Sequence, residues 1–189
     1  MQTARGTGLI EQLPPLEPTP RSAGSLQWAG LLAVAAAVVV ADQVTKHLIV
    51  DRIALGDGHQ VLPFLEITHL RNTGIAFGIF PGRLEVVSLL TALAVVWMLA
   101  HFAKSGSRHV LFPVALGFLI GGSVSNLYDR ITNGYVTDFI HVSHWPTFNL
   151  ADCFIVVGVV LLLVGLGRLD HGASAEHGGP PGGPPGELV

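Results

Sequence analysis

The stretch LQWAGLLAVAAAVVVA, residues 26–41, contains no charged side chain and decides the class of this protein. Its apolar character continues to about Val50. Three further apolar blocks follow, at residues 84–102, 110–127 and 151–167. A helix that crosses a bilayer needs about 20 mostly apolar residues. All four blocks are near this length, so the sequence predicts four membrane-spanning helices.

The composition of the whole chain agrees with an all-α membrane protein. Hydrophobic residues make up 50% of the 189 residues, charged residues only 12%, and the mean hydropathy is +0.56. Soluble domains usually contain about 25% charged residues. Four buried helices in a soluble chain of this length would leave too little polar surface to cover them. The net charge of −3, with no basic stretch, argues against a nucleic-acid partner.

The two ends of the chain differ from its apolar middle. Residues 1–25 contain four prolines and scattered charges, and residues 170–189 end in GGPPGGPPGELV. Both compositions are typical of disordered tails, so we expect one membrane domain at 26–169. The first apolar block could instead be a cleaved signal peptide, but it is longer than the usual apolar region of such a peptide.

Two polar connections are expected on the side of the membrane opposite the termini. Residues 51–83 include VLPFLEITHL, whose β-branched and aromatic residues predict short strands. Residues 128–150 include Asn133-Gly134, which is a turn signal. The Lys and Arg residues divide evenly between the two sides, so the positive-inside rule does not orient the chain. We expect the function on the face that carries these connections.

Asp42 and Lys46 are charged groups inside the first apolar block. A charged group at the centre of a membrane helix costs at least about 2.5–3.5 kcal/mol. Because the two residues are four apart, they share a helix face and can pair. We favour an internal ion pair that anchors this helix in the bundle, and contact with a substrate is the alternative.

Asp138 and Asp152 flank apolar blocks on the same expected face. Two carboxylates in a partly dry site do not ionise together easily, so one keeps a proton while the other is charged. Such a pair can activate water as a general base and protonate a leaving amine as a general acid. This is the chemistry of aspartic peptidases. From spacing alone, a solvated loop aspartate or a helix cap at Asp152 explains the pattern as well.

Other polar residues near these aspartates have simpler explanations. His141 and His144 lack the H-E-x-x-H pattern and a third strong ligand, so we expect no metal site. Cys153 is better explained by packing within an apolar helix than by a role as a nucleophile. Asn126 and Asn149 adjoin apolar blocks, where an amide needs hydrogen-bond partners, and they could position the carboxylates. Gly121-Gly122 would let another helix approach closely.

Five short motifs occur together along the chain. They are ADQVTK at 41–46, RNTGIAF at 71–77, GGSVSNLYDR at 121–130, GYVTDFI at 134–140 and FNLAD at 148–152. In order and content they resemble the lipoprotein signal peptidases, also called signal peptidase II. The resemblance covers roughly residues 28–168 and leaves both tails outside.

The resemblance implies a multi-pass bacterial inner-membrane aspartic endopeptidase that needs no cofactor. Its substrates would be diacylglyceryl-modified prolipoproteins, cut just before the lipid-bearing cysteine, and globomycin-like compounds would inhibit it. The implied catalytic residues are Asp138 and Asp152. The implied substrate-binding or supporting residues are Asp42, Asn72, Gly122, Asn126, Arg130 and Asn149.

The same resemblance implies an orientation. The termini would be cytoplasmic, the active site would face the outer side, and residues 51–80 would form an extracytoplasmic β-cradle. One departure is Ser125, which stands where the family usually has glycine. Serine is small and tolerated at helix contacts, so we expect function to be retained.

Two other classes of function remain open from the residues alone. A small proton-coupled transporter or channel would use Asp42, Lys46, Asp138 and Asp152 as relay groups. Against it, the blocks at 84–102 and 110–127 hold no central acid or base that would continue a relay. A structural scaffold, in which the polar groups serve only assembly, is the third possibility.

Overall fold

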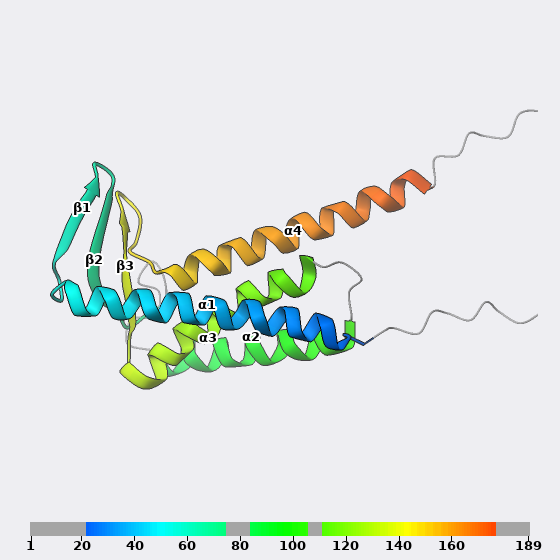
Figure 1. Cartoon of the computed structure of the whole chain (residues 1–189), viewed down its shortest axis with the longest axis horizontal. Coiled ribbons are helices and arrows are strands. Elements are labelled where there is room, and N and C mark those ends of the chain that lie inside the picture. The colour runs from blue at the N-terminus through cyan, green and yellow to red at the C-terminus, as the bar shows by residue number, and fades with distance from the viewer. Residues whose placement is uncertain (1–21, 75–83, 106–110, 177–189) are drawn as a thin grey trace, which may run out of the picture.

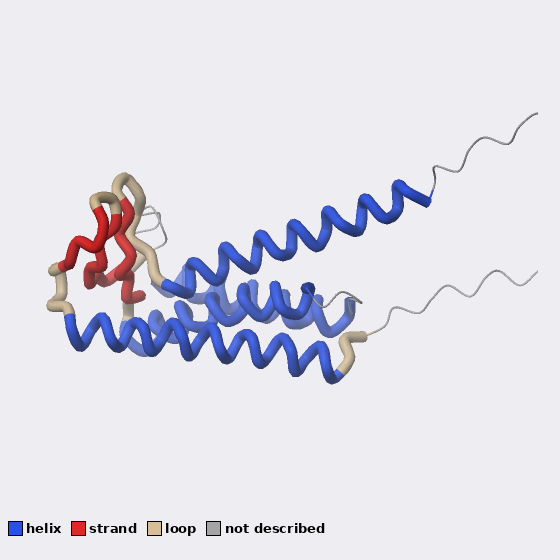
Figure 2. The backbone as a smooth tube through the Cα atoms, turned by 45° about the horizontal axis from the view of Figure 1, so that its top comes forward, coloured by secondary structure: helices blue, strands red, loops and turns tan. Residues whose placement is uncertain are grey.

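The computed structural model describes residues 22–74, 84–105 and 111–176 of the chain. The elements follow in the order α1 (Ser25–Arg52), β1 (Gly58–Leu62), β2 (Leu65–Asn72), α2 (Leu84–Ser105), α3 (Leu111–Asn133), β3 (Val136–Val142) and α4 (Leu150–Glu176). The helices run lengthwise, the strands gather at one end of them, and α4 diverges from the other helices towards its C-terminal end (Figure 1). Figure 2 shows the same separation of helices and sheet.

Each of the four apolar blocks forms a helix, as predicted. By length and composition, α1, α2 and α3 are apolar enough to cross a membrane, whereas the apolar part of α4, Leu150–Gly165, is shorter. Side chains of α2 such as Leu89, Leu93 and Trp97 are exposed, which suits a surface that faces lipid. The protein is therefore mostly helical, with apolar helices and one small sheet.

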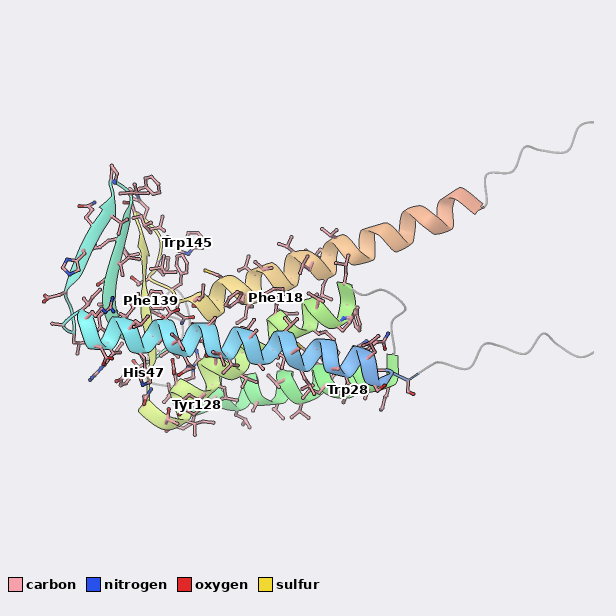
Figure 3. All side chains as sticks on the ribbon, in the orientation of Figure 1. Trp28, His47, Phe118, Tyr128, Phe139 and Trp145 are labelled. Carbon is pink, nitrogen blue, oxygen red and sulfur yellow. The ribbon has the colours of Figure 1, made fainter. Side chains whose placement is uncertain are left out.

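The helix α3 is the centre of the bundle. In its most apolar window 56% of the residues are buried, compared with 17% in α1 and in α2. An apolar core between α1, α2 and α3 contains Leu31, Phe102 and Ile120. The ring of Trp28 meets Phe102 edge-on, with 4.9 Å between centroids. Figure 3 shows Trp28 at the end of the bundle away from the sheet.

Gly121 and Gly122 let two helices approach α3 from different sides. A Cβ atom at Gly121 would lie 2.8 Å from the backbone oxygen of Ala35 in α1. A Cβ atom at Gly122 would lie 2.6 Å from the backbone oxygen of Ala151 in α4. The expected close helix contact is thus confirmed, and small residues at such contacts are typical of membrane bundles.

The buried residues of α1 form one stripe along the helix. They are Leu31, Val38, Asp42 and Lys46, and spacings of seven and four residues place them on a single face. The predicted shared face of Asp42 and Lys46 is therefore confirmed. Both charged side chains point into the bundle and are almost completely buried.

The three strands form an antiparallel sheet in the order β1-β2-β3. The residues of VLPFLEITHL, from which short strands were predicted, lie in the first two strands, and these strands form a hairpin with its turn at residues 63–64. The third strand comes from the connection between α3 and α4, and Leu65 of β2 pairs with Val142 of β3. The sheet thus joins both polar connections, and of the expected cradle at 51–80 residues 75–80 lie outside the described residues.

The helices α3 and α4 extend by more than a turn beyond their apolar blocks. The helix α3 continues past Leu127 to Asn133 and ends at Gly134, which has a φ of +75° and donates its N–H to the oxygen of Arg130 at 3.2 Å. A glycine in this conformation commonly ends a helix, so the predicted turn is confirmed. The helix α4 continues to Glu176, into the segment expected to be disordered. Residues 1–21 and 177–189 lie outside the described residues.

Candidate active site

The loop after β3 folds back onto that strand. The N–H of Phe139 donates to the oxygen of Phe148 at 3.0 Å, and the N–H of Phe148 donates to the oxygen of Ile140 at 3.0 Å. These bonds hold the start of α4 beside the middle of β3. Figure 3 shows Phe139 and Trp145 at this end of α4. Asn149, which follows Phe148, therefore lies within reach of Asp138.

Asp138 lies in strand β3, where only a loop was expected, and is 3% exposed. Asn72, at the end of β2, donates its Nδ2 to Asp138 Oδ2 at 2.8 Å. Asn149 donates its Nδ2 to Asp138 Oδ1 at 2.7 Å. Burial raises the pKa of Asp138 to about 6, although these two amide donors act in the opposite direction. The negative charge of Asp152 adds to the rise.

Asp152 caps α4 and also reaches the same site. Asn149 precedes the helix, and its Oδ1 accepts the N–H of Asp152 at 3.1 Å. In return, Asp152 Oδ2 accepts the N–H of Asn149 at 3.2 Å. This reciprocal arrangement is a capping box. The other oxygen, Oδ1, accepts Asn126 Nδ2 at 2.8 Å, so capping does not occupy the whole carboxylate.

Two amides connect the two carboxylates. Asn149 Nδ2, which bonds Asp138, also donates to Asn126 Oδ1 at 3.1 Å, and Asn126 in turn bonds Asp152. Asp138 and Asp152 line one pocket of about 130 Å³. The rest of its lining consists of Asn72, Asn126, Arg130, Val136, Asn149 and residues 145–148. The structure therefore brings the two predicted carboxylates, one in β3 and one in the first turn of α4, into one cavity.

A buried cluster around Lys46 adjoins this pocket, because Asn126 lines the pocket and also contacts Lys46. Its Nζ is 2.7 Å from Asp42 Oδ2, 2.8 Å from Asp129 Oδ2 and 3.0 Å from Asn126 Oδ1. A lysine ammonium has three N–H donors, and each has an acceptor here. The predicted pair of Asp42 and Lys46 is confirmed. The partner Asp129 was not expected from the sequence.

Asp42 ties three helices together. Its Oδ2 also accepts the hydroxyl of Ser125 in α3 at 2.7 Å, and its Oδ1 accepts the N–H of Ala151 in α4 at 2.8 Å. The side chain of Gln43 donates to Ser125 Oγ at 3.0 Å and to Asp129 Oδ1 at 2.9 Å. Ser125, the departure from the family pattern, thus supplies a hydrogen bond to a buried carboxylate.

The residues singled out from the sequence fall into two groups. Asn72, Asn126, Arg130 and Asn149 line the pocket with the two carboxylates. Asp42, Lys46 and Gly122 do not line it and instead hold the helices around it. Sequence reasoning missed Trp145, Thr147 and Phe148 as lining residues. Their places follow from the loop that folds back on β3, which no local motif signals.

The histidines do not form a metal site with these residues. His141 Nδ1 lies 3.3 Å from Thr147 Oγ1, and His144 has a positive φ of 66°. Among the described residues, no group of three or more His, Cys, Asp or Glu side chains is placed to hold a metal ion.

Several known proteins are similar to this chain. A family model described as signal peptidase (SPase) II matches residues 34–167. The lipoprotein signal peptidases of Staphylococcus aureus strains JH9 and Newman are each 35% identical over 140 residues, which cover 71% of this chain and 86% of theirs.

Two solved structures, both described as bacterial membrane enzymes studied by the in meso method, have the same fold. The first has a TM-score of 0.71 at 31% sequence identity and covers 80% of this chain and 93% of its own. The second has a TM-score of 0.68 at 31% identity and covers 79% of this chain and 97% of its own. The region matched by the family model runs from α1 into α4 and includes both pocket carboxylates, and on this match the chain belongs to the signal peptidase II family.

Proposed function

We propose that this protein removes the signal peptide from diacylglyceryl-modified prolipoproteins, with Asp138 and Asp152 as the catalytic pair. The observation that carries the proposal is the convergence of these two carboxylates on one pocket, joined through Asn126 and Asn149. The Staphylococcus aureus relatives are named lipoprotein signal peptidases, and family membership supports a protease of this kind. The transporter alternative has no such support.

The chemistry follows from a pair that shares one proton. The charged carboxylate removes a proton from water, and the water oxygen attacks the carbonyl carbon of the scissile peptide bond. The protonated carboxyl donates its proton to the developing oxyanion. When the tetrahedral diol collapses, the C–N bond breaks and the leaving nitrogen takes the proton that the first carboxylate removed from water. A hydroxyl of the diol returns a proton to the other carboxylate, so the pair again shares one proton. A pKa of about 6 leaves Asp138 partly protonated near neutral pH, as a general acid requires.

The amides and Arg130 act as positioning groups in this proposal. Asn72 and Asn149 fix the two oxygens of Asp138, and Asn126 fixes one oxygen of Asp152. Geometry held in advance contributes to the rate because the reacting groups need no reorganisation. Arg130 lines the pocket and places a positive charge near both carboxylates. That charge can also hold polar groups of the substrate or of a globomycin-like inhibitor.

The membrane arrangement belongs to the same proposal. We infer four spans, in which α4 crosses together with α1, α2 and α3, and both termini are in the cytoplasm of a bacterial inner membrane. The sheet and the pocket lie at the same end of the bundle, which would then be the outer face (Figure 1). A pocket at the membrane boundary gives water access to the scissile bond while the diacylglyceryl chains stay in lipid.

Cleavage by the purified full chain tests the catalytic pair. The substrate is a lipidated prolipoprotein in detergent micelles, and the product is resolved by gel mobility. Asp138→Asn and Asp152→Asn should each lower cleavage by at least about 10²–10⁴-fold, the usual contribution of acid–base catalysis. Asp57→Asn makes the same chemical change on an exposed residue outside the pocket and should cleave as the wild type does.

Each aspartate variant also needs an intact fold. A thermal unfolding midpoint near that of the wild type shows that lost cleavage reports chemistry rather than unfolding. If both Asn variants fold and still cleave, the assignment of the pair is wrong. Cleavage that persists in EDTA is expected, whereas loss on chelation would point to the histidines instead.

A further inference from the structure

The pairing of β2 with β3 shifts by one residue in the middle of the two strands, between Ile67 and Leu70. Thr68 and His69 lie in this interval, and only Phe139 of β3 lies opposite them, which is the arrangement of a β-bulge. Both residues of this bulge are buried, although neighbouring strand residues normally alternate between the two faces. The proposed peptidase chemistry uses neither of them.

The bulge decides which side chain of β2 reaches Asp138. Beyond the bulge, Asn72 pairs with Val136, so its side chain lies on the same face as Asp138. Arg71 lies on the opposite face, where its guanidinium stacks 4.5 Å over the ring of Tyr135. If the pairing before the bulge continued unchanged, Arg71 would lie opposite Val136 and Asn72 would point to the other face.

The identity of that side chain matters for the chemistry of Asp138. Asn72 donates its Nδ2 to Asp138 Oδ2 at 2.8 Å and accepts the N–H of Gly74 on its Oδ1 at 2.9 Å, so both ends of the amide are held. A guanidinium beside a carboxyl favours the charged form more strongly than a neutral amide does. A general acid has to keep a proton near neutral pH, which an arginine in this place would oppose.

The segment between α1 and β1 holds the bulge in place (Figure 1). The carbonyl oxygen of Asp57 accepts the hydroxyl of Thr68 at 2.9 Å and the N–H of His69 at 3.0 Å. The N–H of Gly56 donates to the oxygen of His69 at 2.9 Å. His69 Nδ1 lies 2.8 Å from the oxygen of Ile53, and because a carbonyl only accepts, Nδ1 carries the proton. The bulge is thus tied to the residue at which α1 ends.

We propose that Thr68 and His69 are positioning residues, which act on the cleavage reaction through the register of β2. By fixing the bulge they keep the amide of Asn72 against Asp138 and leave Arg71 on the other face. This inference rests on the proposed function, in which Asp138 is the general acid. Neither bulge residue lines the pocket, so each acts through Asn72 and not on the substrate.

A double-mutant cycle on cleavage by the full chain tests the proposal. His69→Leu keeps an apolar side chain in the buried site but removes the N–H that reaches Ile53, and Asn72→Ala removes the donor to Asp138. Each should lower kcat by about tenfold or more, the range of one hydrogen bond to a charged group. Because both act on one contact, His69→Leu should lower kcat by less than about twofold in the Asn72→Ala background. Equal losses in both backgrounds would overturn the proposal.

The pH profile separates this role from a general loss of structure. The hydrogen bond from Asn72 lowers the pKa of Asp138, so its loss raises that pKa. The alkaline limb of kcat, where the general acid loses its proton, should therefore move to higher pH in both single variants and no further in the double variant. The other charged groups around Asp138 are the same in every variant, namely Asp152, Lys46 and Arg130. An unmoved limb in His69→Leu would overturn the proposal.

Two conservative variants carry the same test with less disturbance of the fold. His69→Asn retains an N–H near the position of Nδ1 and should keep kcat within about threefold of the wild type. Thr68→Val keeps the shape of the side chain but removes its bond to Asp57, and should lower kcat in the same direction as His69→Leu. A loss in His69→Asn as large as in His69→Leu would count against the proposal.

The matched control is His59→Leu, which makes the same change on an exposed residue of β1 and should leave cleavage unchanged. Failure of this inference differs from failure of the proposed function. If Asp138→Asn still cleaves, the proposed function is wrong. If Asp138→Asn is inactive while the losses from His69→Leu and Asn72→Ala simply add, the function stands and the role of the bulge is refuted.

Discussion

The buried lysine offers the sharpest test of what holds the bundle together. Lys46→Met keeps a long, flexible side chain but removes the ammonium that contacts Asp42, Asp129 and Asn126 at 2.7, 2.8 and 3.0 Å. Both carboxylates then remain buried without a cation. Neither loses every donor, because Asp42 keeps Ser125 and the N–H of Ala151, and Asp129 keeps Gln43.

The expected loss of stability follows from these contacts. Removing one partner of a buried ion pair typically costs about 3–5 kcal/mol, because the remaining charge is left uncompensated. The surviving donors place the cost here near the lower end, at about 3 kcal/mol. For a chain of this size, each kcal/mol lowers the melting temperature by roughly 2–4 °C. We therefore expect a melting temperature lower by about 6–12 °C.

The assay is thermal unfolding of the full chain in detergent micelles, followed by tryptophan fluorescence. Lys104→Met is the matched control, because Lys104 is exposed in the last turn of α2 and should change stability by less than about 0.5 kcal/mol. Adding Asp129→Asn to Lys46→Met removes one uncompensated charge and should recover part of the loss. The two substitutions are thus expected to be non-additive.

Two results would refute this reasoning. A Lys46→Met protein that melts within 2 °C of the wild type, a margin of about 1 kcal/mol or less, would show that the ion cluster contributes little to folding. A double variant that loses the sum of the two single losses would show that Lys46 and Asp129 are not coupled.

Three further predictions concern packing, hydrogen bonding and pH. Gly122→Ala should destabilise the protein by about 1–3 kcal/mol in the same unfolding assay, because the new Cβ would lie 2.6 Å from the Ala151 oxygen. Gly30→Ala is the control: its Cβ would meet nothing within 4 Å, so this variant should be neutral or slightly stabilising. Ser125→Ala should cost about 1–3 kcal/mol, since a buried carboxylate loses a donor, and an unchanged melting temperature would contradict this. The pKa of Asp138 rises from 3.8 to about 6 on folding, so the folded state binds this proton more tightly than the unfolded state does. The free energy of unfolding should therefore fall by roughly 3 kcal/mol as the pH rises from about 4 to above 6. Asp138→Asn should remove this pH-dependent fall. If the melting temperatures of the wild type and of Asp138→Asn change in parallel across pH 4–8, the predicted contribution of Asp138 is wrong.

Much of the fold could be read from local pattern. The apolar blocks set the positions of the helices because their length matches a bilayer, and that information lies within each block. The strands β1 and β2 were predicted from β-branched and aromatic residues, but their pairing as a hairpin was not. Asn133-Gly134 marked the turn that ends α3. The ends of α3 and α4 were missed, because a loss of apolar character stops a hydrophobic block without stopping the helix. Asp129 and Arg130 consequently lie on a helix.

The pairing of Asp42 with Lys46 was predictable for the same reason, since a spacing of four residues brings two side chains together in any helix. The third member of the cluster was not. Asp129 is more than eighty residues away and meets Lys46 only because Gly121 lets α1 pack closely on α3. No pattern within one segment carries that contact.

The sequence by itself determined the helices, the short strands near residues 61–70, the i, i+4 ion pair and, through its motifs, the family. Only the tertiary structure decided that β3 joins the hairpin, that Asn149 bonds Asp138 while capping α4, and that Asp138 and Asp152 share a cavity. The physical reason is the separation along the chain over which each kind of interaction acts. Helix and turn preferences act between near neighbours, whereas a shared cavity depends on how distant segments pack, which the chain settles only when it folds.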